Sequence, residues 1–187
     1  NLAGEALTAN SIKAVVTDLM QDASQSLLQL MGGKGYRLDH VAGRSVVDSR
    51  PFQIFEGSND VLYQQISESV LKSMRSLKEK NLYAFLSDHD MTHRAADYFE
   101  DTLDFEVDLS LPQRKLVELG RILGRVISME LTIELGDRGF RSDLISNCLQ
   151  VFQKDVDSRV NAYRNHQLTD VVEDYVEGSA WLEYVNV

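Results

Sequence analysis

One carboxylate in the sequence, that of Glu56, stands where backbone geometry could fix it for proton transfer. It directly precedes Gly57 and Ser58 in the segment FEGSND, and Ser58 is a good N-cap for a following helix. The residues before it, Ile54 and Phe55, are apolar, and an apolar wall raises the pKa of a carboxyl group toward neutrality. This arrangement suits a general base, although a Glu-Gly pair before a helix is also common in ordinary surface turns.

A second segment, QLMGGKGY at residues 29–36, places a glycine cluster after a long amphipathic run. Glycines beside a helix end can let a phosphate approach the backbone, and the free N–H groups after Ser58 could also receive one. The same glycines could simply end the helix. The segment is not a P-loop, because the Lys-Ser/Thr pair and its glycine spacing are absent, and no strand-turn-helix context supports a dinucleotide fingerprint.

Composition narrows the class of protein. The chain has 187 residues, of which 43% are hydrophobic, and a net charge of -10. This charge argues against nucleic acid or an anionic membrane as the main partner. The single cysteine, Cys148, excludes an internal disulfide and a Cys-rich zinc site and suits a reducing compartment. No apolar run approaches the ~18–20 residues that span a bilayer, so we expect a soluble, intracellular protein.

The apolar periodicity predicts an all-α fold, drawn as an antiparallel helical bundle with additional C-terminal helices. Strong helical periodicity covers residues 11–31, 59–79, 112–135 and 142–165, and weaker periodicity covers 92–102 and 169–184. The first strong segment ends at the glycine pair, and the third is expected to end before Gly136. Residues 37–55 show no helical period and are predicted to form an extended connection.

Three other features have simple structural interpretations. Cys148 is spaced with apolar residues on one helical face and is expected in the core. Trp181 and Tyr184 are expected to anchor the last segment. His89 and His93 have a spacing that could bind a metal on one helical turn, but no third ligand is evident, so a solvated polar turn is favoured and no metal is predicted.

In their order and spacing, QLMGGKGY, GRSVVDSRPFQI and FEGSND resemble the C-terminal helical domain of FAD-dependent acyl-CoA dehydrogenases. In that family, Gln-x-x-Gly-Gly-x-Gly-aromatic ends one helix, and Glu-Gly-Thr/Ser-Asn opens the next. The resemblance covers about residues 9–76. It implies that residues 1–80 are part of this domain, and that 81–187 form an additional helical region packed on it, as in long-chain and very-long-chain members.

The resemblance implies roles for individual residues. Glu56 falls on the base that removes the α-proton of an acyl thioester while the β-hydride passes to the flavin, and its backbone N–H would hold the thioester oxygen. Phe55 would line the acyl pocket. The positions implied to contact FAD are Gln29, Gly32 and Gly33, acting from the partner subunit, and Gly57, Ser58 and Asp60.

The resemblance also implies partners: an acyl-CoA substrate, electron-transfer flavoprotein or a similar acceptor, and a homo-dimer or tetramer. The expected location is a bacterial cytoplasm or the mitochondrial matrix. One departure is Val47-Asp48 where the family usually has Arg-Asp, so one ion pair is expected to be missing.

The family's N-terminal helical domain and central β-domain are not represented in these residues. The chain is therefore expected to be the C-terminal part of a longer dehydrogenase, and alone neither to hold FAD tightly nor to turn over substrate. Two alternatives remain: a non-catalytic interaction or dimerisation domain that retains the scaffold, and a flavoprotein relative with another substrate.

Overall fold

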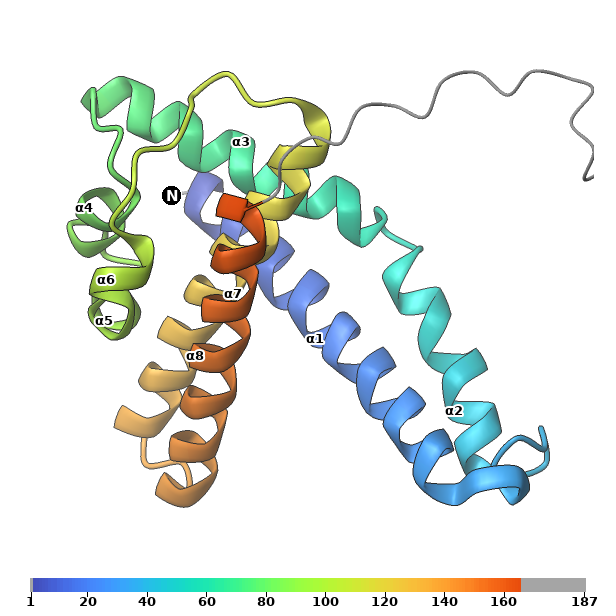
Figure 1. Ribbon diagram of the computed structural model, residues 1–187. Helices are drawn as coiled ribbons and strands as arrows, with labels where there is room; N and C mark the ends of the chain where they lie inside the picture. Colours follow the sequence, from blue (N-terminus) through green and yellow to red (C-terminus); the bar gives the residue numbers. More distant parts are fainter. Residues whose placement is uncertain (1, 166–187) are drawn as a thin grey trace, which may run out of the picture.

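The computed structural model describes residues 2–165, and apart from one isolated bridge between Asn81 and Glu106 the regular structure in this range is helical (Figure 1). The all-α fold class is confirmed. The elements are α1 (Leu2–Met31), η1 (Gly32–Lys34), α2 (Val41–Ser49), η2 (Arg50–Gln53), α3 (Asn59–Leu77), α4 (Leu82–Ser87), α5 (His93–Ala96), η3 (Asp97–Phe99), α6 (Glu100–Leu103), α7 (Gln113–Asp137) and α8 (Ser142–Asn165).

Two pairs of helices extend from α3, which lies across one end of the molecule (Figure 1). On one side α1 runs away from α3, and α2 returns beside it toward the start of α3. On the other side α7 and α8 form a hairpin. The two arms diverge from the region where α1, α3 and α7 contact one another, and that crossing holds much of the core.

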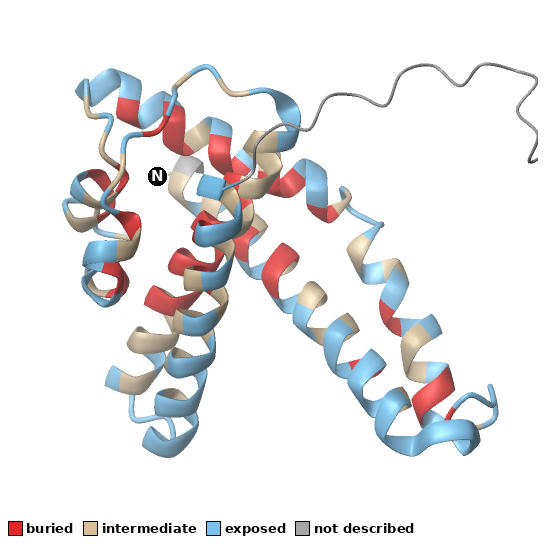
Figure 2. Cartoon of the chain, viewed as in Figure 1, coloured by how far each residue is buried: buried red, intermediate tan, exposed pale blue. Residues whose placement is uncertain are grey.

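The core consists of apolar residues that recur at helical spacing on these elements, and Figure 2 shows them in red around the crossing. They include Ala14 and Val15 of α1; Leu62, Ile66, Val70 and Met74 of α3; Leu119, Ile122, Val126 and Met129 of α7; and Val156 and Val160 of α8. Residues before and after position 80 therefore share one core. The division into 1–80 and 81–187 stays a prediction.

The connection that was predicted to be extended is helical. Residues 41–49 form α2 and residues 50–53 form η2. The His40 side chain caps α2 by accepting a hydrogen bond from Ala42 N–H at 3.1 Å, and Ser49 donates to Gln21 of α1 at 2.7 Å. The prediction was wrong because so short a helix depends on packing against α1, which periodicity does not report.

The segment predicted as one weak helix over 92–102 is divided into α5, η3 and α6. The buried carboxylate of Glu130, on α7, accepts hydrogen bonds from Ala95 N–H at 2.9 Å and from Arg94 at 2.5 Å. These bonds attach α5 to α7. A tertiary contact to one carboxylate thus organises this acid-rich stretch.

The expectation that Cys148 lies in the core was wrong. Cys148 is exposed on α8, whereas Leu149 and Phe152 pack against the core and Val156 and Val160 are buried in it. Val61 and Leu77 lie exposed near the ends of α3. On α1, Ile12 and Val16 are exposed although they flank the buried Ala14 and Val15. Further along α1 the exposed apolar residues are Leu19, Leu27, Leu30 and Met31.

Two helix boundaries also differ from expectation. α1 begins at Leu2, and α7 continues through Gly136 to Asp137. The predicted helix 169–184 and the anchor residues Trp181 and Tyr184 lie outside the described residues. Among the helices of residues 2–165, none is long and apolar enough to cross a membrane.

The backbones of α3 and α7 approach each other closely in the core. A Cβ added to Gly120 would lie 2.0 Å from the backbone oxygen of Tyr63, so only glycine fits there. Ser67 Oγ of α3 donates to the carbonyl of Leu116 at 2.6 Å beside the same contact. By contrast, a Cβ on Gly136 of α7 would make only ordinary contact, 3.4 Å from Ile145.

This contrast gives a matched pair of stability predictions. Gly120→Ala should lower the free energy of unfolding by about 2–3 kcal/mol, because the methyl group forces the helix backbones apart. Gly136→Ala should be neutral or raise it by up to ~1 kcal/mol, because alanine lowers the conformational cost of forming a helix. Urea unfolding of both variants tests this. Equal stability of the two variants would contradict the close approach.

Candidate active site

Glu56 lies in the turn between η2 and α3, and its backbone is left-handed, with φ 57°. Gly57 follows with φ 92°. Left-handed backbone is uncommon for a residue other than glycine. Lys78 also has positive φ, but it ends α3 as a C-cap, where this conformation is usual. Glu56 has no such explanation, and unusual backbone of this kind clusters at functional sites.

The turn exposes the groups that proton transfer would use. The Glu56 side chain is exposed, and its backbone N–H donates no hydrogen bond within the described part of the chain. Before the turn, Phe55 N–H and Ile54 N–H donate to the carbonyl of Pro51 at 2.9 and 3.0 Å. The side chains of Ile54 and Phe55 are themselves exposed, so residues 2–165 alone do not build the expected apolar wall around the carboxylate.

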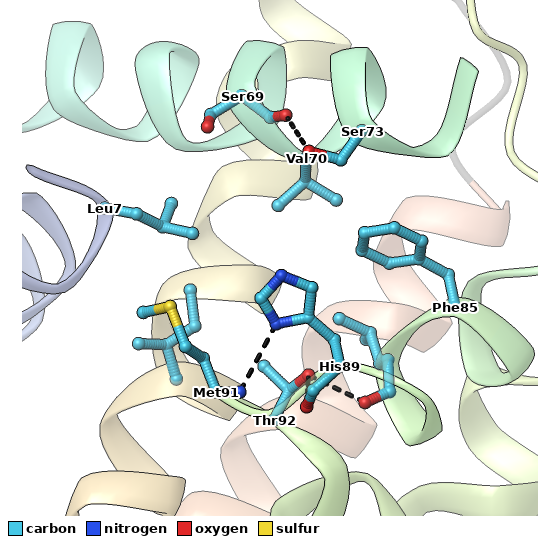
Figure 3. Close-up of a pocket in the computed structure, with 10 residues that line it drawn as sticks. Leu7, Ser69, Val70, Ser73, Phe85, His89, Met91 and Thr92 are labelled. Atoms are coloured by element: carbon cyan, nitrogen blue, oxygen red, sulfur yellow. Dashed lines mark hydrogen bonds between the residues drawn. The ribbon is translucent and has the colours of Figure 1, made fainter. Parts of the chain in front are cut away.

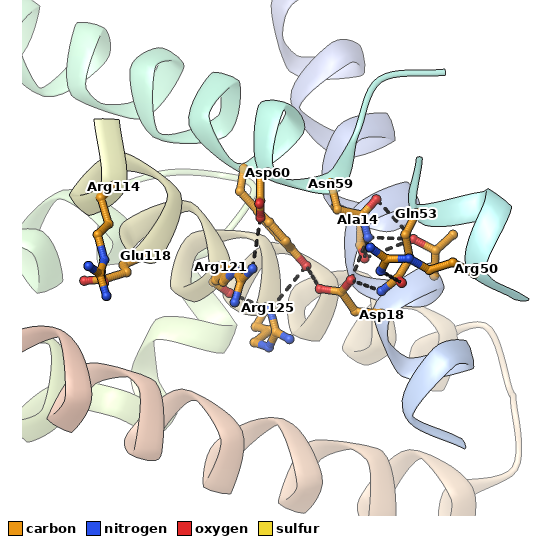
Figure 4. A network of polar contacts seen from close by, with 12 residues as sticks. Ala14, Asp18, Arg50, Gln53, Asn59, Asp60, Arg114, Glu118, Arg121 and Arg125 are labelled. Carbon is orange, nitrogen blue, oxygen red and sulfur yellow. Dashed lines mark hydrogen bonds and ion pairs between the residues drawn. The ribbon is translucent and has the colours of Figure 1, made fainter. Parts of the chain in front are cut away.

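Asn59, the first residue of α3, attaches the turn to α1 (Figure 4). Its buried side-chain amide donates to the Ala14 carbonyl at 3.1 Å and to Asp18 at 2.6 Å. Asp18 also accepts from Gln53 of η2 at 2.7 Å. The residues on both sides of Glu56 are thereby tied to one carboxylate of α1.

The same carboxylate connects this turn to the other arm. The Tyr63 hydroxyl donates to Asp18 at 2.7 Å, and Arg125 of α7 lies 3.4 Å from that hydroxyl. Arg125 is 2% exposed and pairs with Asp155 of α8. Burial raises the pKa of Tyr63, the positive charge of Arg125 opposes this, and Asp18 adds to it. The network therefore holds a neutral phenol between a carboxylate and a guanidinium.

The expected cofactor contacts fall into two separated groups. Gln29, Gly32 and Gly33 lie at the exposed far end of α1, whereas Lys13 of α1 lies beside the Glu56 turn. The helix rise of ~1.5 Å per residue puts about 28 Å between Lys13 and Gly32. One chain therefore does not bring the two groups together.

Ser58 and Asp60 differ in what they contact. Ser58 has the extended backbone of an N-cap, but in the described part its hydroxyl makes no capping bond. The Asp60 carboxylate pairs with Arg121 of α7 at 2.9 Å. The hydroxyl is therefore open to a ligand, while the carboxylate is directed toward α7.

The histidines of SDHDMTH each contact residues of their own segment. His89 Nδ1 accepts from Met91 N–H at 3.3 Å, and its ring packs against Phe85 with centroids 5.6 Å apart (Figure 3). His93 Nδ1 lies 3.2 Å from the Asp90 carbonyl. The adjoining cavity under α3 has a volume of about 20 Å³, enough for about one water molecule. Within residues 2–165, no three metal-ligating side chains are placed to hold an ion.

Comparison with known proteins finds a similarity for the first part of the chain. The acyl-CoA dehydrogenase C-terminal domain matches residues 3–71. Over these residues the chain is similar to that domain. Isobutyryl-CoA dehydrogenase, mitochondrial, of Bos taurus is 42% identical over 60 residues, which is 32% of this chain and 14% of that protein. No solved structure matches the chain significantly.

The segment that matches this domain includes α1, α2, η2 and the Glu56 turn, and most of α3. The sequence did not reveal that Asp18 organises this turn, because a lone acid on an amphipathic helix usually faces solvent. The Asn of FEGSND could have indicated this contact only weakly, because a polar residue at a helix start is usually exposed. Arg125 was missed because it lies outside the segment that carries the resemblance.

The Arg125–Asp155 pair predicts an acid-sensitive contribution to stability. Burial alone would raise the pKa of Asp155, but the hydrogen bond and charge of Arg125, with those of Arg159, hold it below its usual value of 3.8. A lowered carboxyl pKa contributes stability above the unfolded-state pKa, and this contribution is lost as pH falls through the folded-state pKa.

Asp155→Asn should therefore destabilise the chain at pH 7, by about 1–3 kcal/mol because Asp155 is partly exposed. The difference from wild type should shrink below about pH 4. Urea unfolding from pH 7 to pH 3 measures this. Asp22→Asn, at an exposed acid of α1 without an ion pair in the described residues, is the control. A pH-independent difference would contradict the assignment.

Proposed function

We propose that this chain supplies the base and part of the FAD site of an acyl-CoA dehydrogenase, with Glu56 as the base. The observation that carries the proposal is the left-handed backbone of Glu56, in a turn tied on both sides to α1. The family match over residues 3–71 supports the reaction class.

In this proposal the exposed Glu56 carboxylate takes the α-proton of an acyl-CoA thioester. The Glu56 N–H donates to the thioester oxygen, and this bond strengthens as negative charge develops there. FAD, when bound, would supply the acceptor for the β-hydride. Phe55 lines the acyl chain, and its exposure indicates that other parts of the dehydrogenase cover it.

The residues present fit an FAD contact. Among residues 2–165, a Cβ on Gly33 would meet no atom within 4 Å, and the φ of Gly33 is not positive. Neither packing nor backbone conformation in this range therefore requires glycine there. A glycine that the fold does not require leaves the backbone bare, and a pyrophosphate can approach such a backbone closely. Gly32 and Gln29 would contribute to the same contact at the far end of α1. At the Glu56 turn, Gly57, Ser58 and the Asp60 carboxylate would contact FAD.

The separation of these two groups favours a second copy of the protein, which would bring the Gln29 end of α1 to the FAD of its partner. A homo-dimer or a tetramer would satisfy this. Electron-transfer flavoprotein or a similar acceptor would reoxidise the cofactor. The proposed locations are the mitochondrial matrix, which suits the mitochondrial relative of Bos taurus, and a bacterial cytoplasm.

The chain spans 14% of the length of that relative, so we propose the activity for the full-length protein. We expect the 187 residues to be inactive on their own. The relative is named for isobutyryl-CoA, and for this chain we propose only the class of acyl-CoA thioesters. A non-catalytic interaction domain is the second candidate, favoured by the exposed apolar residues of α1.

Glu56→Gln in the full-length protein should slow reduction of the bound flavin by acyl-CoA at least ~10²-fold, because the amide cannot accept the α-proton. The visible flavin spectrum should be unchanged. Glu68→Gln, at an exposed glutamate of α3, is the matched control and should reduce flavin at the wild-type rate. Stopped-flow absorbance measures both.

Two outcomes would contradict the proposal. Rapid flavin reduction by Glu56→Gln would remove Glu56 as the base. Absence of flavin from the purified full-length protein would favour the interaction domain.

A further inference from the structure

The Glu56–Gly57 turn is held from one side by an ammonium group. Lys13 Nζ of α1 donates to the carbonyl of Gly57 and to Asn59 Oδ1, both at 2.8 Å. These acceptors belong to the residue directly after Glu56 and to the first residue of α3. The two bonds therefore span the point at which the chain leaves its left-handed conformation and enters the helix.

Lys13 is itself placed by a rigid support. Its neighbours on α1, Ala14 and Val15, are fully buried in the core, and the Ala14 carbonyl accepts from the Asn59 amide. The ammonium group is therefore carried by a helix whose position is fixed by packing in the core. A left-handed non-glycine residue needs such support, because its local backbone preference favours other conformations.

The charge of Lys13 is also close to the carboxylate. Burial lowers the pKa of Lys13, and the negative charges of Asp18 and Glu56 oppose that shift. Hydrogen bonds from a charged donor are stronger than neutral ones. The same group can therefore both fix the backbone and favour a nearby position of the Glu56 carboxylate.

We propose that Lys13 is a positioning residue for Glu56: its two hydrogen bonds, to the Gly57 carbonyl and the Asn59 side chain, hold the left-handed turn that presents the carboxylate and the backbone N–H. The inference rests on the proposed function of Glu56 only where it concerns catalysis. The clamp on the turn can be measured without flavin or substrate.

The first experiment uses ¹⁵N relaxation of the 187-residue chain. In wild type, Glu56 and Gly57 should have order parameters near those of rigid backbone, about 0.8 or higher, and in Lys13→Met they should fall to about 0.6 or lower. Lys72→Met, at an exposed lysine of α3, is the control and should leave them unchanged. Lys13→Arg retains donors and charge and should restore much of the order.

The second experiment uses the full-length flavoprotein. Lys13→Met should lower the rate constant of flavin reduction about tenfold or more, leave acyl-CoA affinity within about twofold, and leave the flavin spectrum unchanged. Lys13→Arg should recover part of the rate. A general loss of packing would instead weaken substrate and flavin binding together. If Lys13→Met does not fold, Lys13→Gln, which keeps one donor group, replaces it in both experiments.

The outcomes separate this inference from the proposed function. Unchanged order parameters at Glu56 and Gly57 in folded Lys13→Met would overturn the clamp. Lost order with an unchanged rate of flavin reduction would overturn the positioning role. If Lys13→Met loses order while Glu56→Gln still reduces flavin, the proposed base is wrong and the clamp stands.

Discussion

The arrangement of this molecule depends on the side chain of Asp18, which accepts hydrogen bonds from three residues on two elements, η2 and α3. Gln53 comes from η2, Asn59 from the start of α3, and Tyr63 from the buried face of α3. Burying a carboxylate costs free energy unless its oxygens accept hydrogen bonds. The charge of Asp18 and its three donors therefore depend on one another. Through Tyr63 and Arg125 the dependence extends to α7 and α8.

The segment that matches the dehydrogenase domain is therefore not an isolated unit within this structure. Its α1 and α3 bury their apolar residues largely against α7, which follows the matched residues in sequence. The Gly120 crossing brings the two backbones into direct contact. Changes in α7 can consequently alter the Glu56 turn without touching it, because the polar network and the core share the same helices.

Sequence periodicity was sufficient for α8 at residues 142–165 and, within two residues at each end, for α3 and α7, because each has an apolar stripe. It gave the end of α1 but not its start, which lies nine residues earlier than predicted. It failed for α2, whose helix depends on contacts with α1, and for Cys148, which is exposed although its neighbour Leu149 packs against the core. The position of Glu56 before a helix was readable from FEGSND. The supporting set of Lys13, Asn59 and Asp18 was not, because tertiary packing brings it together.

The left-handed backbone at Glu56 carries a consequence for how such proteins could change. Glycine would suit that conformation better than glutamate, so a glycine there should relieve local strain while removing the carboxylate. Stability and retention of the carboxylate thus oppose each other at this one position. A variant of this scaffold selected only for stability would tend to lose the acid, whereas one that retains the acid keeps a less stable turn.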